Sequence, residues 1–173
     1  MNLIIKNFRC YKNAHFFFNN NEIILIDGAS GTGKTTIFDG ISWCLYKKVP
    51  GDKSIKITPW SANLKIKTIV KLETNVAKII RTTQPNTLKL IVNSNIDSSK
   101  NILQKEQILE GHSAQCYINE WLGSYDFWIL TSYIVQDGIN QLLFGSSNIK
   151  SELIGRLCFE KEDPELFIEK GKT

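Results

Sequence analysis

Asp27–Tyr46 reads DGASGTGKTTIFDGISWCLY. Its first half matches the phosphate-binding pattern G-x-x-x-x-G-K-S/T, which runs from Gly28 to Thr35. The apolar run EIILI at Glu22–Ile26 precedes the loop and is typical of a buried parallel strand. Apolar residues then recur every four positions after Ile37, so a helix is expected to open from the loop. A strand, a glycine-rich loop and a helix in this order predict a site for a nucleoside triphosphate.

The chemistry expected of this loop follows from its residue types. Its glycines let the backbone turn N–H groups towards a polyphosphate without clashes from Cβ atoms. The first helical turn adds unsatisfied N–H groups and the positive end of the helix dipole. Lys34 is placed to reach the β- and γ-phosphates, and the Thr35 hydroxyl is placed to ligate Mg²⁺. Glycine-rich turns also occur by chance, but the flanking strand and helix favour a nucleotide site.

Composition is that of an ordinary globular domain. The chain has 173 residues, of which 42% are hydrophobic, enough for about one domain with a sizeable core. No apolar run approaches the roughly 18–20 residues that span a bilayer or resembles a signal peptide. A net charge of +4 permits a nucleic-acid partner without requiring one. Four cysteines without a C-x-x-C pair predict reduced thiols in an intracellular protein, and two isolated histidines argue against a His/Cys metal site.

The first half of the chain is expected to be rich in strands. Two strands are expected before the Glu22–Ile26 strand, at Leu3–Phe8 and Ala14–Phe18. After the first helix, alternation of apolar and polar residues predicts an antiparallel meander. Its strands are expected at Leu64–Leu72, Val76–Thr82 and Leu88–Val92.

The second half is expected to be mainly helical. Asp163-Pro164-Glu165 is typical of a helix start, with proline at the first helical position and an acid in the first turn. Serines and glycines predict the boundaries of the other helices. These helices are expected from 98 or 99 to 109, from 113 to 122 and from 146 or 147 onwards, with a short strand at Tyr133–Val135.

A catalytic acid for an NTPase is missing from the pattern. Such an acid normally follows an apolar strand and completes the Mg²⁺ site. Tyr133–Asp137 (YIVQD) has the strand but carries Gln136 where the acid belongs, and Leu88–Asn93 ends in asparagine. No LSGG-like signature is present. The sequence therefore predicts phosphate binding without a catalytic acid of its own.

Three segments have the order and spacing of one known family. Met1–Asn13 (MNLIIKNFRCYKN) resembles its first strand, Phe38–Tyr46 (FDGISWCLY) the helix after its phosphate loop, and Ser132–Leu143 (SYIVQDGINQLL) its Q-loop. The family comprises the SMC-like ATPases of DNA double-strand-break repair, the SbcC-type exonuclease subunits and their archaeal, eukaryotic and phage counterparts. The resemblance implies an α/β P-loop NTPase fold. Specifically, it implies an ABC-type ATPase lobe with an antiparallel β-meander, the N-terminal half of an SMC-like head.

The resemblance also implies roles for individual residues. Arg9 would contact the nucleotide phosphates or sugar, and Thr36 would lie near the α-phosphate. Gln136 would ligate Mg²⁺ or position the attacking water, so Lys34 and Gln136 would be catalytic and Thr35 and Gln136 would be metal ligands. Read without the resemblance, Arg9 is a surface turn residue and Gln136 a solvent-facing residue at a strand end. The residues expected to hold ATP with Mg²⁺ are Arg9, Gly28, Ala29, Ser30, Gly31, Thr32, Gly33, Lys34, Thr35 and Thr36.

The resemblance further implies an incomplete ATPase. Residues 1–163 would form the N-terminal lobe, with the P-loop at 28–36 and the Q-loop at about 133–138. Residues 164–173 would begin a truncated coiled-coil helix. The signature motif and the Walker B carboxylates would lie in a C-terminal half, from the same gene or a separate chain. Expected partners are that half, a second head in a homodimer, a nuclease subunit and DNA, without a membrane partner.

Two other classes stay open, an ABC transporter ATPase domain and a phosphate-loop small-molecule kinase. A kinase needs a lid rich in arginine, whereas Arg9, Arg81 and Arg156 are few and scattered. A transporter domain would have a different opening strand.

Gly40, where the family usually has alanine, costs up to about 1 kcal/mol of helix propensity. Ser30 stands where the family often has asparagine, and it keeps a hydroxyl at that position.

Lysines mark one face of the predicted meander. Lys65, Lys67 and Lys71 share a face of one strand, and Lys89 lies on the outer face of a later strand. Such a face could hold DNA phosphates. Alternatively, it is a solvated face whose lysines prevent edge pairing with other sheets.

Overall fold

The computed structural model describes residues 1–50, 66–93, 106–133 and 146–158. The chain divides into two compact units, Met1–Trp121 and Leu122–Thr173, and each unit is described by itself. Among the described residues, no helix is both long and apolar enough to cross a membrane.

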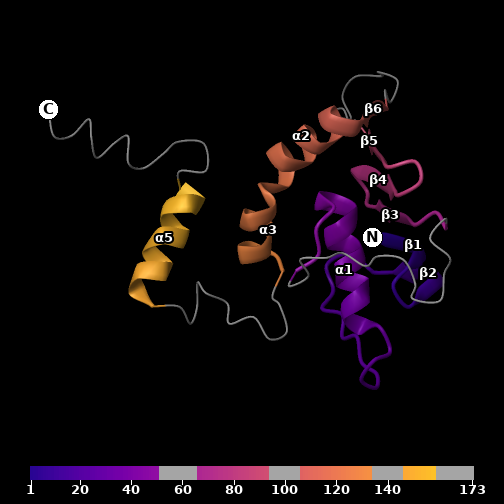
Figure 1. Ribbon diagram of the computed structural model, residues 1–173, viewed down its shortest axis with the longest axis horizontal. Coiled ribbons are helices and arrows are strands. Elements are labelled where there is room, and N and C mark those ends of the chain that lie inside the picture. Colours follow the sequence, from indigo (N-terminus) through magenta and orange to yellow (C-terminus); the bar gives the residue numbers. More distant parts are fainter. Residues whose placement is uncertain (51–65, 94–105, 134–145, 159–173) are drawn as a thin grey trace, which may run out of the picture. The chain divides into compact units, whose positions relative to one another are not determined.

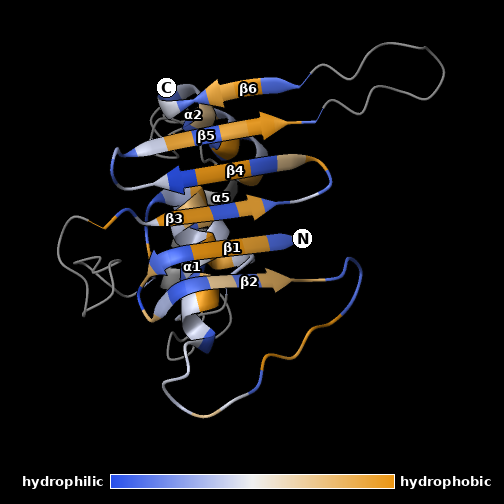
Figure 2. Ribbon diagram, turned by 90° about the vertical axis from the view of Figure 1, so that its right-hand side faces the viewer, coloured by the Kyte–Doolittle hydropathy of each residue, from blue (hydrophilic) through white to orange (hydrophobic). Residues whose placement is uncertain are grey.

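A six-stranded antiparallel sheet is the main element of the first unit (Figure 1). The strands lie in the order β2-β1-β3-β4-β5-β6, so β1 is inserted between β2 and the later meander. Figure 2 looks onto the face of the sheet that is turned away from helix α1. The strands are β1 (Asn2–Phe8), β2 (Tyr11–Phe17), β3 (Ile69–Glu73), β4 (Ala77–Thr82), β5 (Thr87–Val92) and β6 (Gln107–Glu110).

Helix α1 (Lys34–Tyr46) packs against the other face of this sheet. Leu3 and Ile5, which alternate along β1, and Phe8 at the end of the strand are fully buried. The rings of Phe8 and Trp43 lie 5.7 Å apart between their centroids. At Gly40, an added Cβ atom would lie only 2.9 Å from Ile5 Cδ1. The glycine therefore permits a close approach of helix and sheet, which explains why the helix carries a residue of low helix propensity there.

The C-terminal end of α1 is bound by a buried arginine from the sheet. Arg81 of β4 donates from Nε to the Cys44 carbonyl at 2.8 Å and from Nη2 to the Leu45 carbonyl at 3.0 Å. Nη2 also donates to Gln115 Oε1 at 2.7 Å, and Gln115 lies on α2 (Gly111–Leu122). Burial lowers the pKa of Arg81 from its usual value. The carbonyl dipoles at the end of α1 compensate this buried charge, and the network joins α1, β4 and α2.

The thiol of Cys44 is fully buried between α1 and the sheet. Its Sγ donates to the Val70 carbonyl at 3.5 Å, and burial raises its pKa to about 12, although Arg81 opposes that shift. An exposed thiol ionises near pH 9, so the unfolded chain loses this proton first. The contribution of Cys44 to stability is therefore fully present below about pH 9 and is lost as the pH rises towards 12.

We expect Cys44 to resist modification in the folded chain. Cys10 and Cys116 are free and exposed, whereas Cys44 is free and buried as a protonated thiol. At pH 8, a thiol-specific aromatic disulfide reagent should label Cys10 and Cys116 quickly and Cys44 only after unfolding. Peptide mapping by mass spectrometry measures this order. Labelling of Cys44 as fast as Cys10 would contradict the buried placement.

The second unit contains α3 (Tyr125–Thr131) and α5 (Ser147–Cys158) among its described residues. Ser124 caps α3, because its side chain accepts a hydrogen bond from the Phe127 N–H at 3.2 Å. The predicted helix from 146 or 147 is confirmed as α5.

Most predicted strands and helices of the first unit are confirmed. The strands expected at 3–8, 14–18, 76–82 and 88–92 are β1, β2, β4 and β5, and the C-terminal part of 64–72 is β3. The helix expected at 113–122 is α2, which begins at Gly111. The helix expected at 98–109 is wrong over its end, where Gln107–Glu110 forms β6. Pairing with β5 outweighs the local helical pattern there.

Three further expectations fail or lie outside the described residues. Glu22–Ile26, expected as a buried strand, has no regular secondary structure; residues 22–25 are exposed and Ile26 is half-buried. A parallel strand needs a neighbour for its hydrogen bonds, and none of the described strands pairs with this segment. Tyr133 is not part of a strand, while 134–135 and the helix expected from Pro164 lie outside the described residues.

Candidate nucleotide-binding site

The phosphate loop lies between the irregular segment ending at Ile26 and the start of α1. Gly31 has φ 81° and Gly33 has φ 96°, both in the left-handed region that favours glycine. Gly33 is the N-cap of α1, and it carries no side-chain cap. The first N–H groups of α1 therefore face the loop without a side-chain acceptor, as an anion site at a helix N-terminus requires.

Lys34 reaches back over the loop from the first position of α1. Its Nζ donates to the carbonyls of Gly28 at 2.6 Å and Ala29 at 2.7 Å. A bound phosphate would compete with these two carbonyls for the Lys34 ammonium. All three groups accept hydrogen bonds, but only the phosphate is negatively charged. Thr35 is exposed and Thr36 is buried. An exposed hydroxyl at Thr35 fits an oxygen ligand of Mg²⁺, whereas Thr36 offers a phosphate its backbone N–H.

The loop also binds to itself through side chains. Thr32 Oγ1 donates to the Ala29 carbonyl at 2.8 Å, and the Gly28 N–H donates to Asp27 Oδ1 at 2.7 Å. Ser30 and Gly31 are exposed at the tip of the loop. The loop is therefore closed by short-range contacts, and its tip is open to solvent.

The turn between β1 and β2 packs against the base of the loop. Tyr11 donates from its hydroxyl to the Gly33 carbonyl at 3.3 Å. A Cβ atom added to Gly33 would meet Cys10 Sγ at 2.6 Å and the Tyr11 hydroxyl at 3.0 Å. Burial raises the pKa of Tyr11, with a smaller contribution from the neighbouring Cys10. The sequence pattern missed Cys10 and Tyr11 as neighbours of the loop, because their proximity depends on the pairing of β1 with β2.

We expect Gly33→Ala to destabilise the chain by about 2–3 kcal/mol. The left-handed backbone costs an alanine about 1–2 kcal/mol, and the clash with Cys10 and Tyr11 adds an overpacking cost. Gly31→Ala is a matched control, since its φ is also positive but no atom lies within 4 Å of the added Cβ. Gly31→Ala should cost about 1–2 kcal/mol. Denaturant unfolding measures both, and equal losses would contradict the close contact at Gly33.

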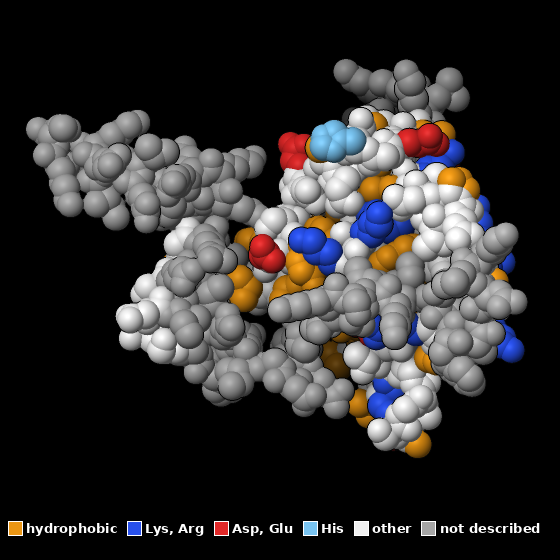
Figure 3. Space-filling model, viewed as in Figure 1, with side chains coloured by type: hydrophobic (Ala, Val, Ile, Leu, Met, Phe, Trp, Pro, Cys, Tyr) orange, Lys and Arg blue, Asp and Glu red, His pale blue; other side chains and the backbone are white. Residues whose placement is uncertain are grey.

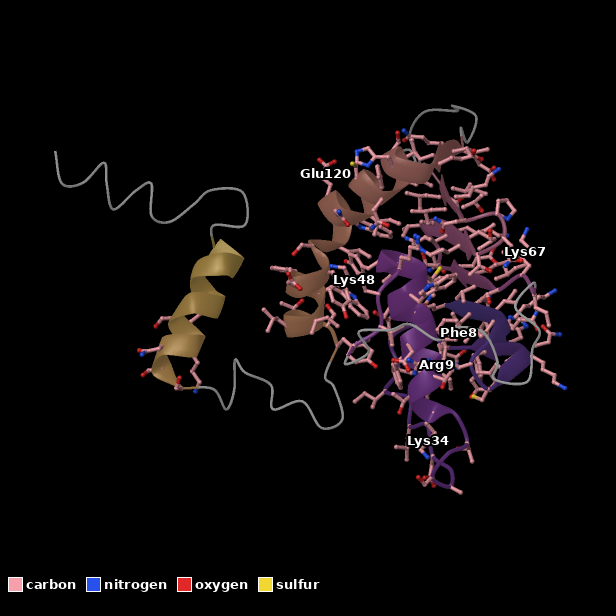
Figure 4. The ribbon with its side chains drawn as sticks, viewed as in Figure 1. Phe8, Arg9, Lys34, Lys48, Lys67 and Glu120 are labelled. Carbon is pink, nitrogen blue, oxygen red and sulfur yellow. The ribbon has the colours of Figure 1, made fainter. Side chains whose placement is uncertain are left out.

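Arg9 follows β1 and lies beside α1 (Figure 4). Its Nη1 donates to Asp39 Oδ2 of α1 at 2.5 Å. The Arg9 side chain is 26% exposed and that of Asp39 is 3% exposed. Removing one partner of a buried ion pair typically costs about 3–5 kcal/mol, since it leaves a buried charge. Arg9 is therefore held against the helix that opens from the phosphate loop, and Asp39 is a neighbour that the sequence pattern did not single out.

The remaining predicted ligand lies outside the described residues. Gln136 falls in the range 134–145, so the structure gives no position for it. Gly28–Thr36 form the loop and the first turn of α1, and Arg9 is held on the same helix through Asp39. Within the described ranges, no group of three or more His, Cys, Asp or Glu side chains could hold a metal ion. Among the described residues, Thr35 is therefore the candidate to ligate Mg²⁺ at this loop, together with the phosphates and water.

The lysine face is only partly free for a polyanion. Lys71 and Lys89 lie on the sheet face opposite α1, on either side of Ile80 in the strand register. Lys89 forms a salt bridge with Glu110 at 3.5 Å. Basic side chains also gather along the right-hand edge of Figure 3, over the strands. Lys67 is exposed beside this face, and Lys65 lies outside the described residues.

A separate hollow of about 440 Å³ lies at the far end of β1 from Arg9. Asn2, Phe17 and Asn75 contribute to its lining, and Asn2 Oδ1 is buried without a hydrogen-bond partner. The phosphate loop does not line it. The hollow is therefore separate from the candidate nucleotide-binding loop.

Comparison with known proteins agrees with the phosphate loop. Residues 2–172 match the family model described as an AAA domain. The uncharacterised protein 050L of Invertebrate iridescent virus 6 is 29% identical over 171 residues, and the uncharacterised protein 094L of Invertebrate iridescent virus 3 is 30% identical over 124 residues. These alignments cover 99% and 72% of this chain but only 14% and 13% of the viral proteins. Because the family match covers nearly the whole sequence and includes the loop, the chain belongs to the AAA domain family and is a P-loop ATPase domain of the SMC-like kind.

Proposed function

We propose that this chain is the ATP-binding half of an SMC-like DNA repair and recombination ATPase. In such an enzyme, ATP-driven dimerisation of two heads regulates DNA binding and a partner nuclease. The observation that carries the proposal is the glycine loop that opens directly into α1, with Lys34 folded over it. The family match over residues 2–172 supports the SMC-like class. The repair role and the nuclease partner rest on the resemblance of Met1–Asn13 and Ser132–Leu143 to repair ATPases.

The exposed segment before the loop supports the part of the proposal that makes this chain one half of an ATPase head, called the half-head proposal below. Leu25 is 88% exposed and Ile23 is fully exposed, although Glu22–Ile26 has the composition of a buried strand. Strands of a C-terminal half, from the same polypeptide or a separate chain, would pair with this segment and bury it. That half would also supply the acid that orients water for hydrolysis.

Three residues of this chain would act on the metal and the phosphates. Thr35 would ligate Mg²⁺ through its hydroxyl, and Gln136 would complete the ligand set or position the attacking water. When bound, Mg²⁺ neutralises phosphate charge. Lys34 would leave the carbonyls of Gly28 and Ala29 and bind the β- and γ-phosphates. DNA would contact lysines of the open sheet face, where Lys71 forms no salt bridge with any described residue.

The half-head proposal predicts that this chain binds Mg·ATP but barely hydrolyses it. The chain alone should show phosphate release at the level of its Lys34→Ala variant, because the catalytic acid and the second head are missing. Adding the C-terminal half should restore turnover that depends on Lys34. A malachite-green phosphate assay measures both states. Lys34-dependent turnover by the purified chain alone would contradict the half-head proposal and leave nucleotide binding intact.

A further inference from the structure

We infer that Asp39 is a positioning residue for nucleotide binding, because its buried carboxylate holds the Arg9 guanidinium on α1 while the next two residues, Cys10 and Tyr11, pack against Gly33 of the phosphate loop. The inference rests on the proposed function and adds a residue to its site. Asp39 lies five positions after Lys34 on the same helix. A group fixed to α1 is therefore fixed relative to the loop that opens that helix. Figure 4 shows Phe8, Arg9 and Lys34 following one another alongside α1.

The ion pair has the geometry of a fixed contact. Arg9 Nη1 and Asp39 Oδ2 are 2.5 Å apart, and the Asp39 side chain is only 3% exposed. Most of the Arg9 side chain is also covered, with 26% exposed. A surface arginine loses much conformational entropy when it is held in this way. The buried carboxylate provides the compensating interaction.

The backbone of the same turn is held independently of the ion pair. Asn7 and Arg9 have φ values of 52° and 49°, which are uncommon for residues other than glycine. Asn7 Nδ2 donates to the Lys67 carbonyl at 3.1 Å, and Thr68 Oγ1 donates to the Asn7 carbonyl at 2.7 Å. Tyr11 then joins the turn to the Gly33 carbonyl. The turn is therefore fixed at both ends, and Asp39 fixes the side chain between them.

The burial of Asp39 bears on whether Arg9 stays on Asp39 or leaves it when a nucleotide binds. If Arg9 moved away to reach a phosphate, the Asp39 carboxylate would lose a cationic partner at a position that solvent barely reaches. A planar guanidinium can instead serve two anions on different edges. Arg9 therefore stays on Asp39 and meets the nucleotide through its exposed part. The ion pair orients Arg9 before the nucleotide arrives, which lowers the entropic cost of binding.

A double-mutant cycle on Mg·ATP affinity tests this inference. Asp39→Asn and Arg9→Ala should each raise Kd about tenfold, measured by calorimetry on the 173-residue chain. The double variant should bind no worse than Arg9→Ala, because Asp39 acts through Arg9. Glu110→Gln is the matched control, since it breaks the exposed salt bridge to Lys89 on the far face of the sheet and should leave Kd unchanged.

The outcomes separate a positioning role from a structural one. A purely structural pair would lower the melting temperature of the variants while the folded chain keeps its Kd, and that result would overturn the inference. Additive losses in the double variant would also overturn it. If Asp39→Asn does not fold, Arg9→Lys replaces it, because lysine keeps the charge but lacks the planar second edge. Unchanged affinity in Arg9→Lys would overturn the inference.

Mg·ATP binding by the unmodified chain and its variants tests the role of Asp39 separately from the proposed function. Absence of Mg·ATP binding by the unmodified chain would overturn both. Binding that requires Lys34 but ignores Asp39 would overturn the inference and keep the proposed function. Binding that requires Lys34 and shows coupled losses at Arg9 and Asp39 supports both.

Discussion

Lys34→Ala should weaken Mg·ATP binding at least about 100-fold and leave the fold intact. Lys34 is the loop's ammonium at the first position of α1, and its present partners are the carbonyls of Gly28 and Ala29 in an exposed loop. Those hydrogen bonds exchange readily for water, so their loss costs little stability. The attraction of the ammonium to the β- and γ-phosphates has no such replacement. Titration calorimetry measures the affinity, and a thermal melt checks the fold.

Lys67→Ala is the matched control for Lys34→Ala. Lys67 is another exposed lysine of the first unit, located just before β3 and away from the loop. Its removal changes the net charge by the same amount and should leave Kd within about twofold. Unchanged affinity in Lys34→Ala would refute the phosphate-loop assignment. Equal losses in the two variants would show that overall charge, rather than the loop, governs nucleotide binding.

Arg81→Met should lower the free energy of unfolding by about 3 kcal/mol. The substitution removes the donors that bind the carbonyls of Cys44 and Leu45 at the end of α1. The Leu45 carbonyl keeps its hydrogen bond from Gln115 Nε2 at 3.1 Å, whereas the Cys44 carbonyl and Gln115 Oε1 lose the bonds from Arg81. A buried acceptor left without a donor costs about 1–3 kcal/mol. Methionine restores apolar contact and avoids burying a charge, which offsets part of this loss. For a domain of this size the melting temperature should fall by about 10 °C, as differential scanning calorimetry measures.

Lys78→Met provides the control for Arg81→Met. Lys78 lies on the same strand as Arg81, half-buried on the opposite sheet face, and its salt bridge to Glu73 at 3.4 Å is partly exposed. Such exposed pairs contribute about 0–1 kcal/mol, so the loss should be small. Equal destabilisation by the two variants would contradict the Arg81 network as the anchor of the α1 C-terminus. Because α1 opens from the phosphate loop, Arg81→Met should also weaken Mg·ATP binding where the fold survives.

Local sequence patterns predicted the elements whose partners lie nearby or whose periodicity is strong. Helix α1 follows from its apolar spacing and the glycine loop before it, and β4 follows from alternation in residues 77–82. Residues 107–110 show the limit of such patterns. Their short apolar run suits a helix end as well as a strand, and pairing with β5 makes them β6. The secondary structure of such a segment depends on a hydrogen-bond partner far away in the sequence, and local periodicity carries no information about that partner.

The phosphate loop itself was determined by the sequence alone. Glycine, lysine and threonine at fixed spacing carry its chemistry, because the conformation of the loop and the donors at the helix start are local properties. Only the tertiary structure decided what surrounds it. The pairing of β1 with β2 brings Cys10 and Tyr11 to Gly33, and the packing of α1 brings Asp39 to Arg9. Those contacts join residues 22–30 positions apart, so no local pattern specifies them. The exposed state of Glu22–Ile26 has the same cause, since burial of a strand depends on neighbours that its own sequence does not encode.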